Sequence, residues 1–238
     1  ALIEVQFTDA RRRNFHFSDH NNYTMATLSD HAAVFASAYD AANSIASQVH
    51  YRPFDVWAAN SLWTCKMSAG ESIVALAAGA TFVAVATSAL ALRLFSPLGV
   101  QLDVIALGGR AITLAAHGRR LAVVTATTST TLQADALRYS LYDVDTRRAI
   151  ITEQRLPLSP SRTLQWLGFA GDLGVPLSYD SGGVLRALRI HSYGGAWTPV
   201  LDTSRQRKAP NDWHWPVGAT ATHLLTVVCN AGETSPSP

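Results

Sequence analysis

Short apolar runs rich in Val, Ile, Leu, Phe, Tyr and Thr recur along the chain, and clusters of Gly, Asn, Asp and Ser separate them. Each run covers about five to eight residues, the usual length of a strand and too short for a typical helix. Residues 32–47 alone carry a pattern that would also suit a helix. Strands are predicted at residues 3–7, 23–28, 32–38, 45–51, 61–67, 73–77, 82–87, 91–95, 100–106, 112–116, 121–126, 137–143, 148–155, 164–169, 175–179, 184–190, 197–201, 214–218 and 224–229.

The predicted strands fall into groups of four, most clearly within residues 73–106 and 164–201. A repeated four-stranded unit is typical of a β-propeller blade, and 238 residues hold about six blades, or five, at roughly 40–45 residues each. The predicted fold is therefore all-β, a single β-propeller over residues 1–229, with a linker-like tail at 230–238. A pair of β-sandwiches is the competing arrangement, because the Trp-Asp dipeptide of many propellers does not occur.

Composition narrows the classes of function. The chain is 48% hydrophobic and only 15% charged, which excludes a disordered tail. Its 19 basic and 17 acidic residues give a net charge of +2, so binding of nucleic acid would need a local basic patch. The two cysteines, Cys65 and Cys229, are too few for a disulfide framework.

One stretch, residues 72–92, has the length and the lack of charge that suit a membrane span. Gly79, Thr81 and Thr87 interrupt it, and residues 82–86 form a short β-branched run that favours a buried strand. We therefore predict no membrane segment.

Two fragments are similar to parts of a serine protease of the chymotrypsin family. His117 follows Leu-Ala-Ala, and Ser181 stands in Asp-Ser-Gly-Gly. The two residues are 64 positions apart, too close for the second barrel that carries the nucleophile in that family, and Gly118 stands where a cysteine is expected. We predict that residues 180–183 are a hairpin turn and that the chain is not an enzyme; a serine hydrolase that uses Ser181 and His117 is a remote alternative.

Metal and cofactor sites are also not predicted. His16, Asp19, His20 and His31 are ligand types that cluster early in the chain, but Ser and Asn residues between them indicate a solvated loop without helical spacing. Neither glycine-rich phosphate-binding pattern occurs.

Basic residues gather in short groups, and two of the groups form a candidate nucleic-acid site. Arginine beside aromatic rings is a combination that binds single strands, and Trp213 and Trp215 follow the second group. The competing interpretation is a chain that uses arginine for most cations, with 17 arginines against 2 lysines. The candidate contacts are Arg11, Arg12, Arg13, Arg205, Arg207 and Lys208, and Arg147 and Arg148 form a further basic pair.

A series of motifs, in order along the chain, is similar to one family. The most specific is the run Ala-Thr-Ser-Ala-Leu-Ala-Leu-Arg-Leu-Phe-Ser at residues 86–96. The chain resembles the replisome adaptor family of the acidic nucleoplasmic DNA-binding protein, called chromosome transmission fidelity protein 4 in yeast, at its second, SepB-type β-propeller. The other matching segments are residues 3–9, 22–24, 99–101, 116–118, 156–158, 166–169, 179–186, 197–199 and 215–218.

The resemblance implies a propeller that forms a homotrimer and acts as a non-enzymatic hub of the replication fork. It implies tethering of the replicative helicase, through its GINS subunits, to DNA polymerase alpha-primase, a role in sister-chromatid cohesion, and a nuclear location. In that family the partners bind a helical bundle after the propeller, and the chain stops at Pro238 before such a bundle and without the family's other domains. The motifs assign no residue to the trimer interface. A propeller that binds nucleic acid through its arginine groups is the alternative.

Overall fold

The computed structural model describes residues 2–9, 11–54, 62–127, 136–206 and 212–230. Contacts between Cα atoms divide the chain into two compact units, Ala1–Leu107 and Gly108–Pro238. Within the described ranges the structure is built of strands, with a short 3-10 helix, η2 (Thr203–Gln206), and no α-helix. The all-β prediction is confirmed.

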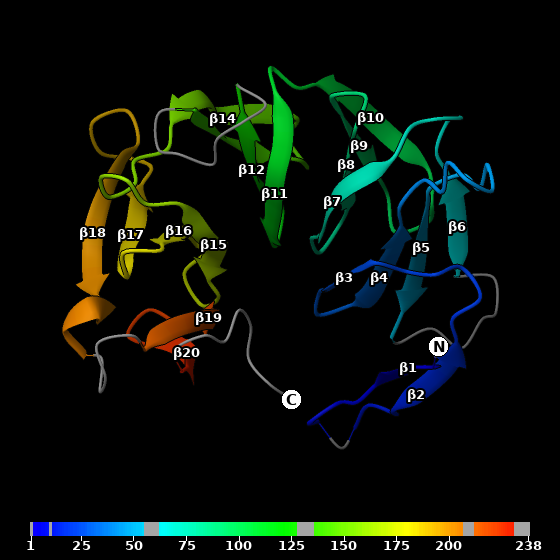
Figure 1. The fold of residues 1–238 in the computed structure, drawn as a ribbon, viewed down its shortest axis with the longest axis horizontal. Coiled ribbons are helices and arrows are strands. Elements are labelled where there is room, and N and C mark those ends of the chain that lie inside the picture. The colour runs from blue at the N-terminus through cyan, green and yellow to red at the C-terminus, as the bar shows by residue number, and fades with distance from the viewer. Residues whose placement is uncertain (1, 10, 55–61, 128–135, 207–211, 231–238) are drawn as a thin grey trace. The chain divides into compact units, whose positions relative to one another are not determined.

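Unit 1 contains a hairpin and two sheets of four strands each, and within each of them every strand pairs antiparallel with the next one along the chain (Figure 1). The hairpin is β1 (Leu2–Val5) and β2 (Phe15–Ser18). The first sheet is β3 (Met25–Leu28), β4 (Ala32–Ser37), β5 (Gln48–Pro53) and β6 (Trp63–Lys66). The second is β7 (Ile73–Ala78), β8 (Val83–Thr87), β9 (Ala91–Phe95) and β10 (Gln101–Ala106).

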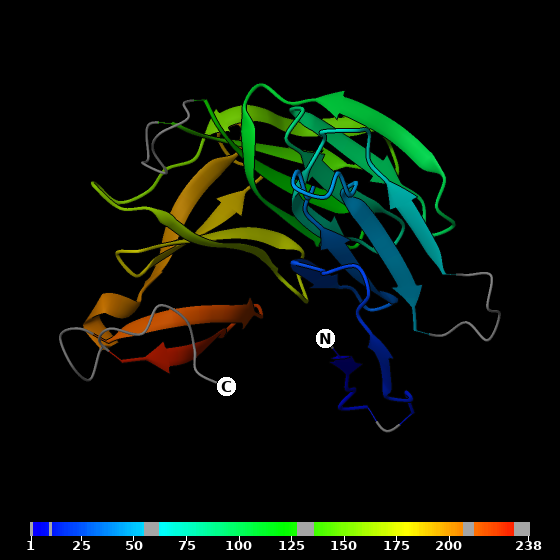
Figure 2. The ribbon, with the colours of Figure 1, turned by 45° about the vertical axis from the view of Figure 1, so that its right-hand side comes forward.

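Unit 2 repeats this arrangement and ends in a hairpin. Its first sheet is β11 (Arg110–His117), β12 (Arg120–Ala126), β13 (Leu137–Asp143) and β14 (Arg148–Arg155). The second is β15 (Leu164–Ala170), β16 (Val175–Asp180), β17 (Val184–Arg189) and β18 (Ala196–Asp202). The hairpin β19 (Trp213–Ala219) and β20 (Leu224–Cys229) meets β15 through one parallel pair, Ala170 with Ala219 (Figure 2).

The inner strands of the sheets are apolar on both faces, which explains why the sheets pack against each other. All residues of β4 and β8 are buried. In unit 1, Val34 and Tyr51 share one core with Val85 and Phe95, so the sheets β3–β6 and β7–β10 form a common interior. A polar contact also joins them, because the Ile73 amide donates to Ser47 Oγ at 2.9 Å.

The strand predictions are correct in type, with differences at the ends. The predicted strands at residues 91–95, 137–143, 148–155 and 224–229 match β9, β13, β14 and β20 residue for residue. Residues 32–47 contain no helix: β4 covers residues 32–37, and a turn closed by the bridge between Asp40 and Ile45 follows it. The prediction omitted β2, because its two phenylalanines alternate with polar residues inside a polar stretch.

The stretch that could have suited a membrane span folds as strands. Residues 73–78 form β7 and residues 83–87 form β8. No helix among the described residues has the length and apolarity that crossing a membrane requires.

A buried ion pair holds the turn between β16 and β17. Asp180, fully buried, accepts hydrogen bonds from Arg186 Nη1 at 2.6 Å and from the amide of Gly182 at 2.9 Å. The turn closes as predicted, since the Gly183 amide donates to the Asp180 carbonyl at 2.9 Å and Gly183 has φ +92°. Ser159 Oγ donates to the same carboxylate at 2.8 Å. The motif Asp-Ser-Gly-Gly is therefore a structural hairpin turn.

We predict that Asp180→Ala lowers the free energy of unfolding by about 3–5 kcal/mol, because it leaves the buried Arg186 guanidinium without its carboxylate. Urea denaturation followed by circular dichroism measures the change. Asp9→Ala is the control, since its ion pair with Arg11 is exposed and should not shift the midpoint. Equal midpoints for Asp180→Ala and the wild-type chain would contradict the role of the pair.

Candidate nucleic-acid interface

The first predicted group, Arg11 to Arg13, does not present three equivalent cations. Arg11 is exposed and pairs with Asp9, with Arg11 Nη2 2.9 Å from Asp9 Oδ2. Hydrogen bonds from Arg11 lower the pKa of Asp9. Arg13 is exposed. The structure thus leaves Arg11 and Arg13 accessible and places Arg12 elsewhere.

Arg12 packs inward against aromatic rings. Its guanidinium carbon lies 5.7 Å from the Phe7 ring centre and 5.6 Å from the Phe54 ring centre. Its Nη1 donates to the Asp30 carbonyl at 2.8 Å. Cation–π contacts of this kind contribute about 0.5–2 kcal/mol, so Arg12 helps to attach the start of the chain to the sheet β3–β6.

A cluster of aromatic and basic residues continues this attachment through the hairpin β1–β2. The guanidinium of Arg52 on β5 lies over two rings of β2, at 4.1 Å from Phe15 and 5.0 Å from Phe17. Phe17 packs edge-on against Phe35 of β4 at 5.4 Å, and its ring is 6.2 Å from His50. Arg52 was not among the predicted site residues; its signal in the sequence would have been the alternation of phenylalanines in β2.

The second predicted group is described only in part. Arg205 lies in η2 and is exposed, with Nε 3.7 Å from Asp202 Oδ2. Arg207 and Lys208 lie outside the described residues. Trp213 and Trp215 pack edge-to-face at 5.5 Å, and Trp215 is 37% exposed. The two groups belong to different units, and binding of nucleic acid by either group stays a prediction.

The serine hydrolase alternative is wrong, because the structure separates its two residues along a strand. Ser181 stands beside Thr163, at the start of β15: its amide donates to the Thr163 carbonyl at 2.9 Å. His117 stacks on Phe169, at the other end of β15, with ring centres 5.7 Å apart. Thr163 and Phe169 are six positions apart along the strand, a distance of about 20 Å. No hydrogen bond can join this serine to this histidine.

The early histidines also occupy separate positions. His16 is on β2, and His20 and His31 are in turns. Asp19 accepts hydrogen bonds from the amides of Asn21 and Tyr23. Across the described ranges, no group of three or more His, Cys, Asp or Glu side chains is placed to hold a metal ion.

Comparison with solved structures defines the class of protein. Over 76% of this chain and 56% of the other, the fold is similar to a crystal structure of HIRA(644–1017), with a TM-score of 0.54 and 19% identity. Over 93% of this chain and 67% of the other, it is similar to KlHsv2 with loop 6CD replaced by a Gly-Ser linker, with a TM-score of 0.57 and 9% identity. At these identities the likeness concerns the fold, which is that of a β-propeller.

Sequence comparison defines the family. The family model for the middle region of the minichromosome loss protein Mcl1 matches residues 1–238, and the chain belongs to this family. It is 33% identical over 239 residues to WD repeat and HMG-box DNA-binding protein 1 of Homo sapiens, across 99% of this chain and 21% of that protein.

Two further relatives match most of the chain at similar identity. Protein ENHANCER OF LHP1 1 of Arabidopsis thaliana is 33% identical over 98% of this chain and 24% of that protein. Minichromosome loss protein 1 of Schizosaccharomyces pombe is 30% identical over 90% of this chain and 27% of that protein. The chain therefore spans about a quarter of the length of these relatives.

His50 in the aromatic cluster should make the stability of the folded chain depend on pH. Burial lowers the pKa of His50, and the charge of Arg52 lowers it further. The unfolded chain, with a histidine pKa of about 6.5, therefore binds this proton more readily than the folded chain. Neutral His50 therefore stabilises the folded chain fully at pH values above about 6.5. This contribution to stability is lost as the pH falls from there through the lower pKa of His50 in the folded chain.

Urea midpoints at about pH 7.5 and 5.5 test this: the wild-type chain should lose more stability on acidification than His50→Phe, which keeps the aromatic contacts. His31→Gln, at an exposed position, should behave as the wild type. An identical loss in all three chains would show that His50 is not responsible.

Proposed function

We propose that the chain is the propeller of a non-enzymatic, trimeric scaffold of the DNA replication fork. In this proposal residues 1–229 act as one propeller domain of the SepB type and residues 230–238 as a linker. The whole protein connects the replicative helicase, through GINS, to DNA polymerase alpha-primase, supports sister-chromatid cohesion, and works in the nucleus. Partner docking lies in parts of the protein beyond the quarter of the relatives' length that this chain spans.

The observation that carries the proposal is the family match over the full chain. The relatives are named for minichromosome loss and for DNA binding, and both names agree with a role on replicating chromosomes. The geometry supports a scaffold in preference to the hydrolase alternative, since the only serine–histidine pair suggested by the sequence is split between the two ends of β15.

Exposed apolar side chains support self-association. A closed ring of three copies joins two different surfaces of each copy, and each surface must bury apolar area. On the hairpin β19–β20, Val217 is 59%, Leu225 53% and Val227 41% exposed. At the turn between β9 and β10, Leu98 is 84% and Val100 is 60% exposed. These two patches are our candidates for the two sides of the contact.

Light scattering tests the assembly. We expect a solution mass of about three times the chain mass of 25.6 kDa, and a monomer for Leu225→Asp/Val227→Asp and for Leu98→Asp, because a buried unpaired carboxylate opposes the contact. Leu28→Asp is the matched control, at an apolar position with 64% exposure. A monomeric wild-type chain at every concentration, or dissociation of the control as well, would refute the assignment.

A further inference from the structure

One end of the first sheet of unit 2 carries a concentration of arginines. Arg119 is in the turn between β11 and β12, and Arg147 is in the turn between β13 and β14. The register places Arg120 opposite Asp143 and Asp143 opposite Arg148. Adjacent strands are about 4.8 Å apart, so two turns bring four guanidinium groups to one sheet end.

Two of these four guanidinium groups are not paired with any described residue. Asp143 is buried, accepts a hydrogen bond from the Thr146 amide at 3.1 Å and pairs with Arg119 Nε at 3.0 Å. Arg147 and Arg148 are exposed. Within the described part of the chain, their guanidinium groups form no ion pair or hydrogen bond.

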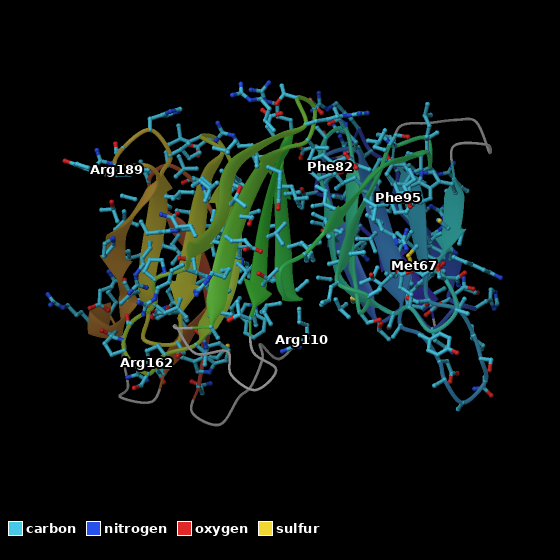
Figure 3. The ribbon with its side chains drawn as sticks, turned by 90° about the horizontal axis from the view of Figure 1, so that it is seen from above. Met67, Phe82, Phe95, Arg110, Arg162 and Arg189 are labelled. Carbon is cyan, nitrogen blue, oxygen red and sulfur yellow. The ribbon has the colours of Figure 1, made fainter. Side chains whose placement is uncertain are left out.

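The second sheet of unit 2 adds a further cation at the same end. The two sheets are in contact there, since Arg120 Nη1 donates to the Gly174 carbonyl, in the turn after β15, at 2.8 Å. Strand β17 runs antiparallel to β16 and so finishes at this end with Arg189. Figure 3 shows Arg189 on the opposite side of the unit from Arg110 and Arg162. Asp145 and Asp172 are the exposed carboxylates of the neighbouring turns.

An exposed aromatic ring follows Arg189. Tyr193, in the turn between β17 and β18, is 94% exposed. Its turn rests on β14, because Gln154 Nε2 donates to the Gly195 carbonyl at 2.8 Å and the Cα of Gly195 faces Ile151. Ile151 is three residues, about 10 Å of strand, from Arg148. Tyr193 therefore lies within a few nucleotides' reach of the unpaired arginines.

We propose that this end of unit 2 binds single-stranded nucleic acid, with Arg147, Arg148 and Arg189 contacting phosphates and Tyr193 stacking on a base. Cations along a track beside an aromatic platform are the elements that bind single strands without sequence preference. This surface goes beyond the scaffold role and uses other residues than the groups at Arg11–Arg13 and Arg205–Lys208.

The observations favour a single strand over two other anions. An acidic peptide would gain from the cations but not from a solitary, solvent-facing ring, since peptide anchors fill pockets. A duplex keeps its bases stacked and offers Tyr193 no free base face. Binding of an acidic peptide and binding of a duplex are therefore the competing outcomes of the test.

Fluorescence anisotropy with a labelled oligothymidine of about 16 nucleotides tests the proposal on the 238-residue chain. We expect Arg147→Ala/Arg148→Ala to weaken binding at least about tenfold at low salt and to reduce the slope of log K against log salt by about 1.4, as two lost phosphate contacts require. Tyr193→Ala should weaken binding about 5- to 150-fold, and Tyr193→Phe should restore it.

Arg110→Ala/Arg162→Ala is the control, because it removes the same charge from the opposite end of the unit. It should change affinity less than twofold. The proposal is overturned if the wild-type chain does not bind at about 50 mM salt, if the control weakens binding as much as Arg147→Ala/Arg148→Ala, or if polyglutamate or a duplex of the same length competes equally and Tyr193→Ala has no effect. Circular dichroism confirms that each variant is folded.

Discussion

Burial of the inner strands of the four-stranded sheets on both of their faces is the constraint on which the rest of the structure depends. Strands β4 and β8 are buried along their whole length, so neither sheet of unit 1 could remain folded in water alone. Each sheet covers its neighbour, and the same holds in unit 2, where Leu141 of β13 and Leu188 of β17 share one core. Loops and turns then project from a rigid interior, which is where recognition surfaces usually lie.

Charged groups inside this interior have partners and serve the fold. Asp180 with Arg186 holds the turn between β16 and β17, and Arg93 forms two hydrogen bonds with Glu71, of 2.8 and 2.9 Å, in the sheet β7–β10. Arg12 and Arg52 cover phenylalanine rings. A high arginine content therefore does not by itself indicate nucleic-acid binding, because some of the arginines hold turns and hairpins in place on the sheets. The arginines that matter for recognition are those whose guanidinium groups face solvent without a carboxylate.

The exposed surfaces outside these structural contacts are of two kinds. The hairpin β19–β20 and the turn between β9 and β10 expose aliphatic side chains, which suits protein association. The end of unit 2 around Arg147 and Tyr193 exposes cations and one ring. The proposed scaffold would use both kinds of surface.

Local pattern was enough to place the strands and the hairpin at Asp180–Gly183, because alternation, β-branching and turn residues act over a few neighbours. Local pattern did not identify β2, because the role of its phenylalanines depends on their contacts with Phe35 and Arg52 in the folded chain. The sequence by itself therefore determined an all-β repeat and the family. Only the tertiary structure decided which arginines are free, since their partners come from segments distant in sequence: the fold turns Arg12 inward and leaves Arg148 exposed at the end of unit 2 that also carries Tyr193.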